Sequence, residues 1–290
     1  MSGILDSMRR WFDSSFAPAG ESRGLDLLRV LPFIAVHAGC LGVLCVGASL
    51  ELVALAATLF AVRMFAVTAF YHRYFSHRAF RTSRPMQFLF ALLGAAAVQR
   101  GPLWWASHHR HHHAHADRPA DAHSALQHGF AWSHAGWFLA RDNFATRQEL
   151  VADLARFPEL RFLDRYDALV PALLAAALYA AGGPAYVVWG FCVSTVALWH
   201  ATFTINSLAH RFGSRRYATR DDSRNNPWLA LLTFGEGWHN NHHHYPGAAR
   251  QGFYWWEVDL SWYGLRLLAA LGLVRELRSV PAAVREARKQ

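Results

Sequence analysis

Two long stretches of the sequence carry almost no charge, and they constrain the fold more than any other feature. Residues 27–50 are almost wholly apolar, interrupted by Arg29 and His37, and residues 53–71 continue the pattern with a single arginine. A transmembrane helix needs about 20 consecutive apolar residues. This part of the chain therefore predicts a helical hairpin that crosses a bilayer twice, with its turn near residues 49–51.

A second uncharged stretch, residues 168–209, is interrupted near its middle by Gly182, Gly183 and Pro184. It predicts a second hairpin, because glycine and proline end helices and form turns. A pair of core helices in a soluble protein is the alternative. Two stretches of spanning length favour membrane spans.

Arginines crowd the segments on one side of these spans. They occur near both termini and between or after the hairpins, whereas both hairpin turns lack them. By the positive-inside rule, the termini and polar segments are expected to be cytosolic. The expected fold is an all-α integral membrane protein, with four transmembrane helices in two hairpins and a cytosolic helical cap, in the cytoplasmic membrane of a bacterium. The expected units are an N-terminal interfacial segment, hairpin 1, a cytosolic histidine-rich segment, hairpin 2 and a cytosolic C-terminal segment (residues 1–25, 26–71, 72–164, 165–209 and 210–290).

The charge and the cysteines argue against two other classes of protein. The net charge is +9, but no RNP, zinc-finger or basic-zipper motif occurs, and arginines beside anionic lipid explain the charge. No nucleic-acid partner is expected. Cys40, Cys45 and Cys192 lie in the apolar stretches without a CxxC pair, so no redox role is expected of them. The first 25 residues resemble an interfacial amphipathic segment rather than a cleavable signal peptide.

The chain has 18 histidines, most of which gather in four motifs beside the apolar stretches: HRYFSH at 72–77, HHRHHH at 108–113, NSLAH at 206–210 and HNNHHH at 239–244. A single histidine near a membrane is usually an interfacial or core residue. Four clusters on one side of the membrane predict a metal site instead. A flexible metal-storage segment is the alternative, but these motifs have aromatic and helix-compatible neighbours.

The spacing of the histidines points to shared helix faces. Positions i, i+3 and i+4 lie on one face, so an H-x-x-H-H pattern directs three imidazoles at one point. The pattern occurs in the last motif and twice in the second, and spacing leaves the second motif open: His239, His242 and His243; His108, His111 and His112 or His109, His112 and His113. His72 and His77 are five residues apart, about 140° around an ideal helix, which predicts a frayed helix end or ligands to two different metals.

The number of imidazoles predicts two metal ions. About nine histidines exceed the four ligands of a tetrahedral zinc site. Imidazole suits iron, zinc or copper, and the cysteines form no cluster that would favour thiolate ligation. The chain has one E-x-x-H pair, Glu236 with His239, so a carboxylate-bridged bundle site is not expected. We expect Glu236 to orient His239, with an ordinary solvated glutamate as the alternative.

HRYFSH, HHRHHH and HNNHH, ordered around two pairs of spans, resemble the three histidine boxes of membrane fatty acyl desaturases of the stearoyl-CoA desaturase type. The resemblance extends from about residue 71 to 262 and includes SHAGW, NSLAH and GEGWHNNHHHYP. In the family's second box an arginine follows the first ligand, which selects His109; His108 then stands in place of a usual Asp. The resemblance implies these metal-site residues: His72, His77, His109, His112, His113, His210, His239, His242 and His243, with Asn206 holding a metal-bound water. Five histidines match no ligand position and are expected behind the ligands or at the surface: His111, His115, His128, His134 and His244.

The resemblance implies a di-iron centre (Fe2+/Fe3+) that activates O2 with two external electrons. It removes two hydrogens from adjacent methylenes of a saturated acyl chain and leaves a cis double bond, expected at Δ9, and water. The substrate is expected to be an acyl-CoA in a closed apolar tunnel, with acyl chains on phospholipids or carrier proteins as the alternatives. Six residues beside the boxes are expected to line that tunnel, with interface packing as the alternative: Trp104, Trp105, Trp132, Trp137, Thr202 and Phe203, the last in a position where many relatives have Trp. Three arginines are expected to meet the headgroup, with lipid contact as the alternative: Arg215, Arg216 and Arg224.

The electron donor is expected to be external, because the chain has no HPGG haem motif, no cysteine cluster and no GxGxxG after a strand. A cytochrome b5 or ferredoxin-type partner with its reductase is implied. A membrane fatty acid or alkane hydroxylase uses similar boxes and is the alternative enzyme. A non-catalytic metal-binding or transport protein is the alternative of another class, for which the spans offer His37 and His200 as ligands.

Overall fold

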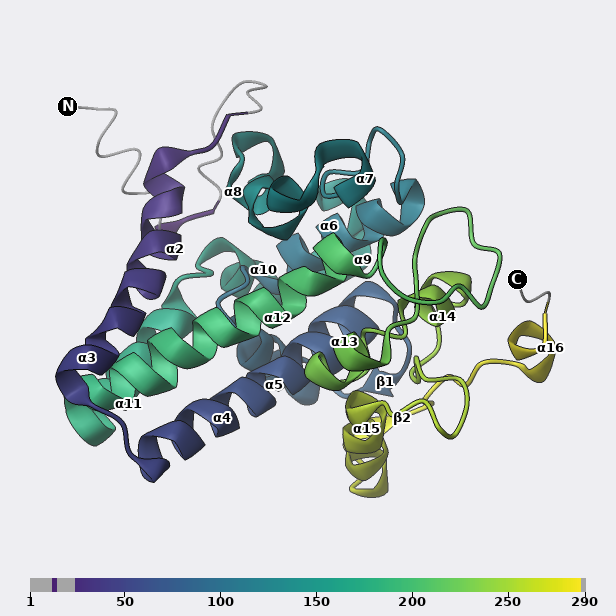
Figure 1. Ribbon diagram of the computed structural model, residues 1–290. Coiled ribbons are helices and arrows are strands. Elements are labelled where there is room, and N and C mark those ends of the chain that lie inside the picture. Colours follow the sequence, from purple (N-terminus) through teal and green to yellow (C-terminus); the bar gives the residue numbers. More distant parts are fainter. Residues whose placement is uncertain (1–11, 15–23, 288–290) are drawn as a thin grey trace.

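The computed structural model describes residues 12–14 and 24–287, which are mostly helical (Figure 1). The expected interfacial segment, residues 1–25, lies almost entirely outside the described residues. Two short strands, β1 (Arg81–Thr82) and β2 (Val274–Arg275), pair antiparallel and depart from the expected all-α fold.

The first apolar stretch forms a helical hairpin. It consists of α2 (Leu27–Gly39), the short segment η1 (Cys40–Gly42), α3 (Val43–Val46) and α4 (Leu50–Phe65). Gly47 turns the chain with a φ of 70°, a conformation that glycine adopts without strain. Ser49 then caps α4 by accepting a hydrogen bond from the Leu52 N–H at 3.2 Å.

Helix α4 does not end where the first hairpin was expected to end. It continues as the π-helical segment η2 (Ala66–Ser76), so the expected boundary between residues 71 and 72 falls inside one continuous helix. All eleven residues of η2 are buried. Helices α5 (Arg84–Ala95), α6 (Pro102–His115) and α15 (Leu260–Ala270) pack around it.

The second apolar stretch folds back on itself at its glycines. It consists of α11 (Leu169–Tyr186), η6 (Val187–Val193) and α12 (Ser194–Leu208). Gly182 and Gly183 leave the helical conformation, and Leu178 packs against Gly190 on the other side of this break. The break coincides with the glycine pair on which the second hairpin was predicted.

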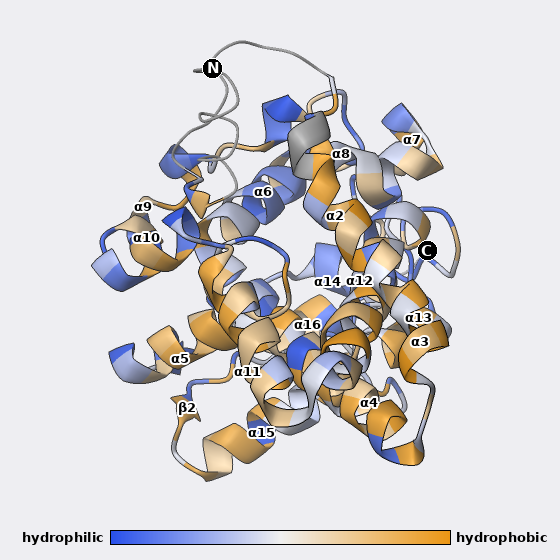
Figure 2. Ribbon diagram, turned by 90° about the vertical axis from the view of Figure 1, so that its left-hand side faces the viewer, coloured by the Kyte–Doolittle hydropathy of each residue, from blue (hydrophilic) through white to orange (hydrophobic). Residues whose placement is uncertain are grey.

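By length and composition, two described helices are able to span a membrane: Leu50–Ser76 and Leu169–Leu208, the second being 40 residues long across its glycine break. A shorter apolar helix covers Val30–Val46. Figure 2 shows the apolar colour on α2, α4 and α11. The structure therefore gives two helices of spanning length where four spans were expected.

Polar side chains inside these helices bond to one another. Arg63, which lies within α4, donates to the Thr195 hydroxyl at 2.7 Å and to the Ser194 hydroxyl, and so ties α4 to α12. The ring nitrogens of His37 and His200 lie 3.0 Å apart and tie α2 to α12. These contacts satisfy polar groups that would be costly to leave unpaired in an apolar environment.

The remaining elements form a cap at one end of the hairpins (Figure 1). Its aromatic core includes Phe70 and Phe90, whose stacked rings lie 3.7 Å apart. Besides α5, α6 and α15, the cap contains α7 (Ala125–His128), η3 (Trp132–Gly136), α8 (Trp137–Leu139), η4 (Arg141–Asn143), η5 (Gln148–Leu150), α9 (Ala152–Ala155), α10 (Pro158–Arg165), α13 (Pro227–Leu232), α14 (His239–His244) and α16 (Ala282–Arg285).

Candidate metal centre

The π-helical segment η2 explains how two histidines five residues apart meet. In a π-helix the hydrogen bonds run between residues i and i+5. The His77 N–H donates such a bond to the His72 carbonyl at 3.3 Å. The two imidazoles are consequently neighbours, with ring centroids 4.9 Å apart. The two imidazoles therefore lie together rather than at two separate metal sites.

Helix α6 brings the second motif to the same place. His109 and His113, one turn apart, face η2, and their rings lie 4.8 and 4.6 Å from the ring of His77. His108 points elsewhere, because its Nε2 bonds to the Ala145 carbonyl at 3.1 Å. Of the two overlapping triplets, the structure therefore brings together the one that begins at His109.

Nine imidazoles gather in two clusters. They come from η2 and its C-terminal cap, from α6, from the end of α12 and from α14. Within each, the potential ligand atoms all lie within 4.8 Å of one another. Cluster A consists of His72, His77, His109, His113 and His242; cluster B consists of His112, His210, His239 and His243. Adjacent residues of α6 and of α14 thus divide between the two clusters.

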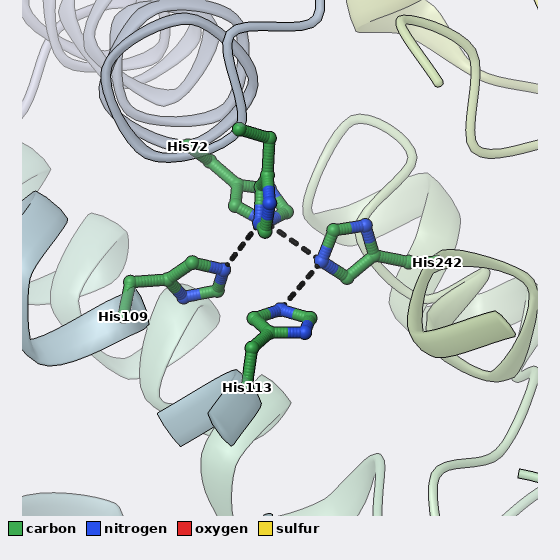
Figure 3. Close-up of side chains that lie close together, drawn as sticks. His72, His109, His113 and His242 are labelled. Atoms are coloured by element: carbon green, nitrogen blue, oxygen red, sulfur yellow. Dashed lines mark hydrogen bonds between the residues drawn. The ribbon is translucent and has the colours of Figure 1, made fainter. Parts of the chain in front are cut away.

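The ring nitrogens of cluster A converge on one point (Figure 3). The Nε2 atom of His242 lies 3.0 Å from Nε2 of His72 and 2.9 Å from Nε2 of His113. Nε2 of His77 lies 2.7 Å from Nε2 of His109. Cluster B repeats the arrangement, since the Nε2 atoms of His210 and His239 are 3.0 Å apart.

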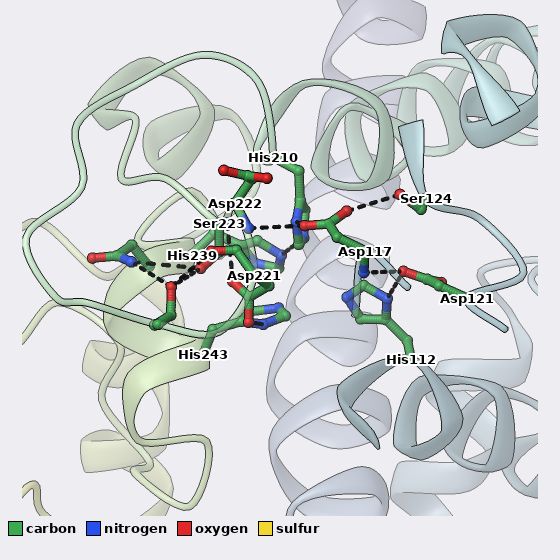
Figure 4. A network of polar contacts seen from close by, with 12 residues as sticks. His112, Asp117, Asp121, Ser124, His210, Asp221, Asp222, Ser223, His239 and His243 are labelled. Atoms are coloured by element: carbon green, nitrogen blue, oxygen red, sulfur yellow. Dashed lines mark hydrogen bonds and ion pairs between the residues drawn. The ribbon is translucent and has the colours of Figure 1, made fainter. Parts of the chain in front are cut away.

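Carboxylates fix the outer nitrogen of four of these rings. The Nδ1 atom bonds to an acidic oxygen in each of four pairs: His72 with Glu236 at 2.5 Å, His112 with Asp121 at 3.0 Å, His210 with Asp117 at 2.7 Å and His243 with Asp221 at 2.9 Å. Figure 4 shows the three aspartates around cluster B. A carboxylate on Nδ1 holds the proton there and turns the Nε2 lone pair toward the cluster.

Sequence reasoning missed the three aspartates and misplaced the glutamate. Glu236 was expected to orient His239, but it contacts His72 and accepts a hydrogen bond from Arg73 at 3.1 Å. The reason is local: α14 begins only at His239, and Phe234 and Gly235 have positive φ angles of 55° and 119°, so helical spacing does not apply. The sequence did carry a signal for Asp117 and Asp121, because both follow shortly after a histidine motif.

The donor set suits metal cations. Burial lowers the pKa of five imidazoles well below the ordinary histidine value and keeps them neutral: His77, His109, His113, His239 and His242. Burial also lowers the pKa of His243 to about 4, and its Nε2 is buried without a hydrogen-bond partner in the described residues. Neutral imidazoles with converging lone pairs are ligands for iron, zinc or copper.

His112 is the exception among these rings. Burial opposes its protonation, but the adjacent Asp121 carboxylate outweighs burial and raises the pKa of this imidazole. Burial would also raise the pKa of Asp117, whereas the hydrogen bond with His210 lowers it to about 2. At His112, metal binding and protonation therefore compete for the same ring.

The histidines without an expected ligand role lie outside both clusters. The rings of His111 and His115 stack on each other, and His244 stacks on Tyr217. His134 bonds to His200, and Nε2 of His128 bonds to the Asp121 carbonyl.

An apolar cavity of about 540 Å³ reaches both clusters. His72 and His109 of cluster A and His112 and His239 of cluster B form part of its wall. Asn206, one turn before His210 on α12, also lines it. The assignment of a metal-bound water to Asn206 stays a prediction.

Five of the six expected tunnel residues line this cavity: Trp104, Trp105, Trp137, Thr202 and Phe203. Trp132 does not, since its indole N–H donates to the Ala122 carbonyl at 2.9 Å. Gln99, which sequence reasoning missed, donates to the Thr202 hydroxyl at 2.9 Å and accepts from the Trp105 indole at 3.4 Å. Gln99 lies in the loop after α5, so these three polar groups join that loop to α6 and α12 at the cavity wall.

The three expected headgroup arginines are engaged elsewhere, and none of them lines the cavity. Arg215 pairs with Asp222 at 3.2 Å. Arg216 pairs with the buried Glu257, and Arg224 donates to the Gly213 carbonyl at 3.3 Å. Their contacts support a role in holding the loop between α12 and α13.

Comparison with known proteins identifies the family. Residues 49–285 match the family model described as fatty acid desaturase. The chain is 43% identical over 208 residues to an sn-2 palmitoyl-lipid 9-desaturase from Nostoc sp. (strain 36), covering 70% of this chain and 73% of that protein. It is 42% identical over 215 residues to a chloroplastic palmitoyl-monogalactosyldiacylglycerol delta-7 desaturase from Arabidopsis thaliana, covering 73% and 57%.

A third relative, an icosanoyl-CoA 5-desaturase from Limnanthes douglasii, is 41% identical over 203 residues, covering 69% of this chain and 57% of that protein. The chain thus matches less than two thirds of the length of some of these relatives. The family match over residues 49–285 includes all nine histidines of both clusters. The chain belongs to the fatty acid desaturase family.

Proposed function

We propose that this protein introduces a cis double bond at Δ9 of a saturated acyl chain, using O2 and two iron ions. The observation that carries the proposal is the meeting of two convergent imidazole clusters with one apolar cavity. An alkyl chain has no polar group near the reacting carbons, so the shape of the cavity has to place it against the metals.

The proposed iron ligands are the nine histidines of clusters A and B, with Asn206 contributing through a water. Iron bound there supplies the activation of O2 and the oxidising power for removing two hydrogens. The residues of the chain hold and orient: the four carboxylates keep the Nδ1 protons in place, and the aromatic wall excludes water.

Two acyl carriers remain candidates, acyl-CoA and a glycerolipid. The names of the Nostoc and Arabidopsis relatives specify lipid-linked chains, and that of the Limnanthes relative specifies a CoA thioester. The double-bond position proposed here follows the 9-desaturase named first. Electrons are proposed to come from an external cytochrome b5 or ferredoxin-type partner with its reductase.

The proposed topology has four spans in two hairpins in a bacterial cytoplasmic membrane. Supporting it are the break at Gly182 and Gly183 inside the 40-residue apolar helix and the apolar helix Val30–Val46 that precedes α4. The positions of the arginines favour termini and clusters on the cytosolic side.

The test is the fatty-acid profile of cells that lack their own desaturase and express this chain, with double bonds located by mass spectrometry. His243→Ala is the inactive control, and His244→Ala, whose ring stacks on Tyr217 outside the clusters, is the matched active control. New cis-monoenes with the parent and His244→Ala, but not with His243→Ala, are expected. Hydroxylated chains would instead establish the hydroxylase alternative, and bound metal without any lipid change in the presence of a working donor would favour a non-catalytic protein.

A further inference from the structure

One charged pair lies in the otherwise apolar part of the cavity wall. The Arg100 Nε donates to the Asp167 carboxylate at 2.6 Å, and both residues line the cavity. Nη2 of Arg100 donates to the Phe144 carbonyl at 3.2 Å, and the guanidinium carbon lies 3.7 Å from the centre of the Phe144 ring. The third nitrogen, Nη1, has no hydrogen-bond partner among the described residues. The arginine is therefore held on two sides, with one donor group left over.

The backbone at Arg100 is held in an uncommon conformation. Its φ is 72°, a left-handed value that non-glycine residues rarely adopt. The Tyr71 hydroxyl fixes the peptide by donating to the Arg100 carbonyl at 3.2 Å. Strain that the surrounding structure maintains is typical of positions that bind ligands.

The pair stands where the cavity reaches an apolar surface. Pro32 and Ala35 of α2 line the cavity and are exposed, and Pro171, near the start of α11 and close in sequence to Asp167, lines it and is buried. Helices α2 and α11 consist mostly of apolar residues (Figure 2). An acyl chain that enters past the exposed residues of α2 comes from an apolar environment.

The distance to the metals matches an acyl chain. Arg100 lies two residues before α6 begins at Pro102, and the seven helical steps from Pro102 to His109 advance the backbone by about 10 Å. With C–C bonds of about 1.5 Å, an extended chain advances about 10 Å from its carbonyl carbon to carbon 9. A carbonyl near the reach of the Arg100 side chain therefore leaves carbon 9 near the clusters.

We propose that Arg100, oriented by Asp167, donates a hydrogen bond from Nη1 to the carbonyl oxygen of the substrate's acyl ester or thioester. The inference rests on the proposed function and adds the group that fixes the chain's register. The charge of the pair suits this acceptor: Asp167 already neutralises the guanidinium, so the rim favours a neutral carbonyl over a multiply charged phosphate.

The first test maps the bound acyl chain in the intact wild-type protein in lipid nanodiscs. The probes are a saturated phosphatidylcholine with a diazirine at acyl carbon 3, the same lipid with the diazirine beside the terminal methyl, and the corresponding two acyl-CoAs. After irradiation, the carbon-3 probe of the true carrier is expected to label peptides containing Arg100 or Phe144. Labelling of these peptides by the methyl-end probes instead, or by neither lipid nor CoA probe, would overturn the inference.

The second test measures steady-state kinetics of Arg100→Met and Arg100→Lys. Loss of a hydrogen bond from a charged donor is expected to raise KM about 10- to 100-fold in Arg100→Met, with partial recovery in Arg100→Lys. Arg84→Met is the matched control, because Arg84 also pairs with a carboxylate, Glu159 at 2.7 Å, but lies outside the cavity. An unchanged KM in Arg100→Met would contradict the inference.

The two tests separate failure of the inference from failure of the proposed function. Photolabelling uses the wild-type protein and does not depend on turnover, so it still reports on Arg100 if a variant folds poorly. Wild-type protein that forms monoenes while its Arg100 peptides stay unlabelled refutes the inference alone. Wild-type protein that forms no monoenes with a working electron donor refutes the proposed function.

Discussion

The carboxylate behind His243 offers a direct test of how the chain prepares its ligands. One oxygen of Asp221 accepts from His243 Nδ1 at 2.9 Å, and the other accepts from the Ser223 N–H at 3.0 Å. In Asp221→Asn, one of these two positions becomes an NH2 group. Whichever way the amide turns, a donor then faces a donor, either at His243 or at Ser223.

The expected loss follows from this conflict. If the amide keeps its oxygen on Ser223, the His243 proton moves to Nε2 and the lone pair that faces cluster B is lost. Removing a carboxylate partner of a ligand histidine typically lowers metal affinity about 10- to 100-fold, or about 1.4 to 2.8 kcal/mol. We expect a loss in this range for Asp221→Asn, with a proportional loss of desaturation.

The measurement is iron retained by the purified full-length protein against a chelator of known affinity, with elemental analysis as the readout. Asp222→Asn is the matched control. Asp222 is the next residue in the chain, and its side chain is 44% exposed and pairs with Arg215. Such exposed pairs contribute about 0 to 1 kcal/mol to stability, so Asp222→Asn is expected to keep its iron. Equal iron affinity in Asp221→Asn and the parent would refute the reasoning, and equal losses in both variants would point to general disruption of the loop.

Three further predictions concern packing, pH and the choice of helix face. Gly94→Ala would place a methyl group 2.0 Å from the Tyr71 ring. This overpacking is expected to lower the free energy of unfolding by about 1–3 kcal/mol and therefore the thermal midpoint. An unchanged midpoint would contradict the close packing of Gly94 against Tyr71. Burial raises the pKa of Asp164 to about 6. Because the folded protein holds this proton more tightly than the unfolded chain, the contribution of Asp164 to stability is full below about pH 4. It declines by on the order of 3 kcal/mol as the pH rises through 6. Asp164→Asn should remove this component from the pH profile of the thermal midpoint, and identical profiles would count against it. His112→Ala should lose iron and turnover while His111→Ala keeps most of both; equal losses in the two variants would mean that the wrong face of α6 was chosen.

The sequence was most informative where chemistry follows regular spacing. Apolar runs of spanning length indicated the hairpin positions, and the glycine pair marked the break inside the second. Helical spacing, with the family's His-Arg order, selected the face of α6 that carries His109 and His113. These inferences succeed because periodicity depends only on local backbone geometry.

The rest depended on tertiary contacts that spacing does not encode. Glu236 faces His72, 164 positions earlier in the chain, because the turn before α14 redirects it. Asp221 lies in a loop whose course is set by its own hydrogen bonds, so no period places it behind His243. Arg216 was expected at a headgroup because it is basic, but Glu257 from a distant segment pairs with it.

The π-helical segment Ala66–Ser76 has a consequence for changes in chain length. Each π turn holds one residue more than the preferred α-helix needs, so deleting a residue here would allow the segment to relax into an α-helix. If the deletion precedes His72, the two histidines stay five residues apart, which is about 140° around an α-helix, so they would no longer share a face. A deletion scan should therefore find this stretch intolerant even at positions where apolar substitutions are accepted. Insertions and deletions that homologous chains tolerate in loops are expected to be rare here.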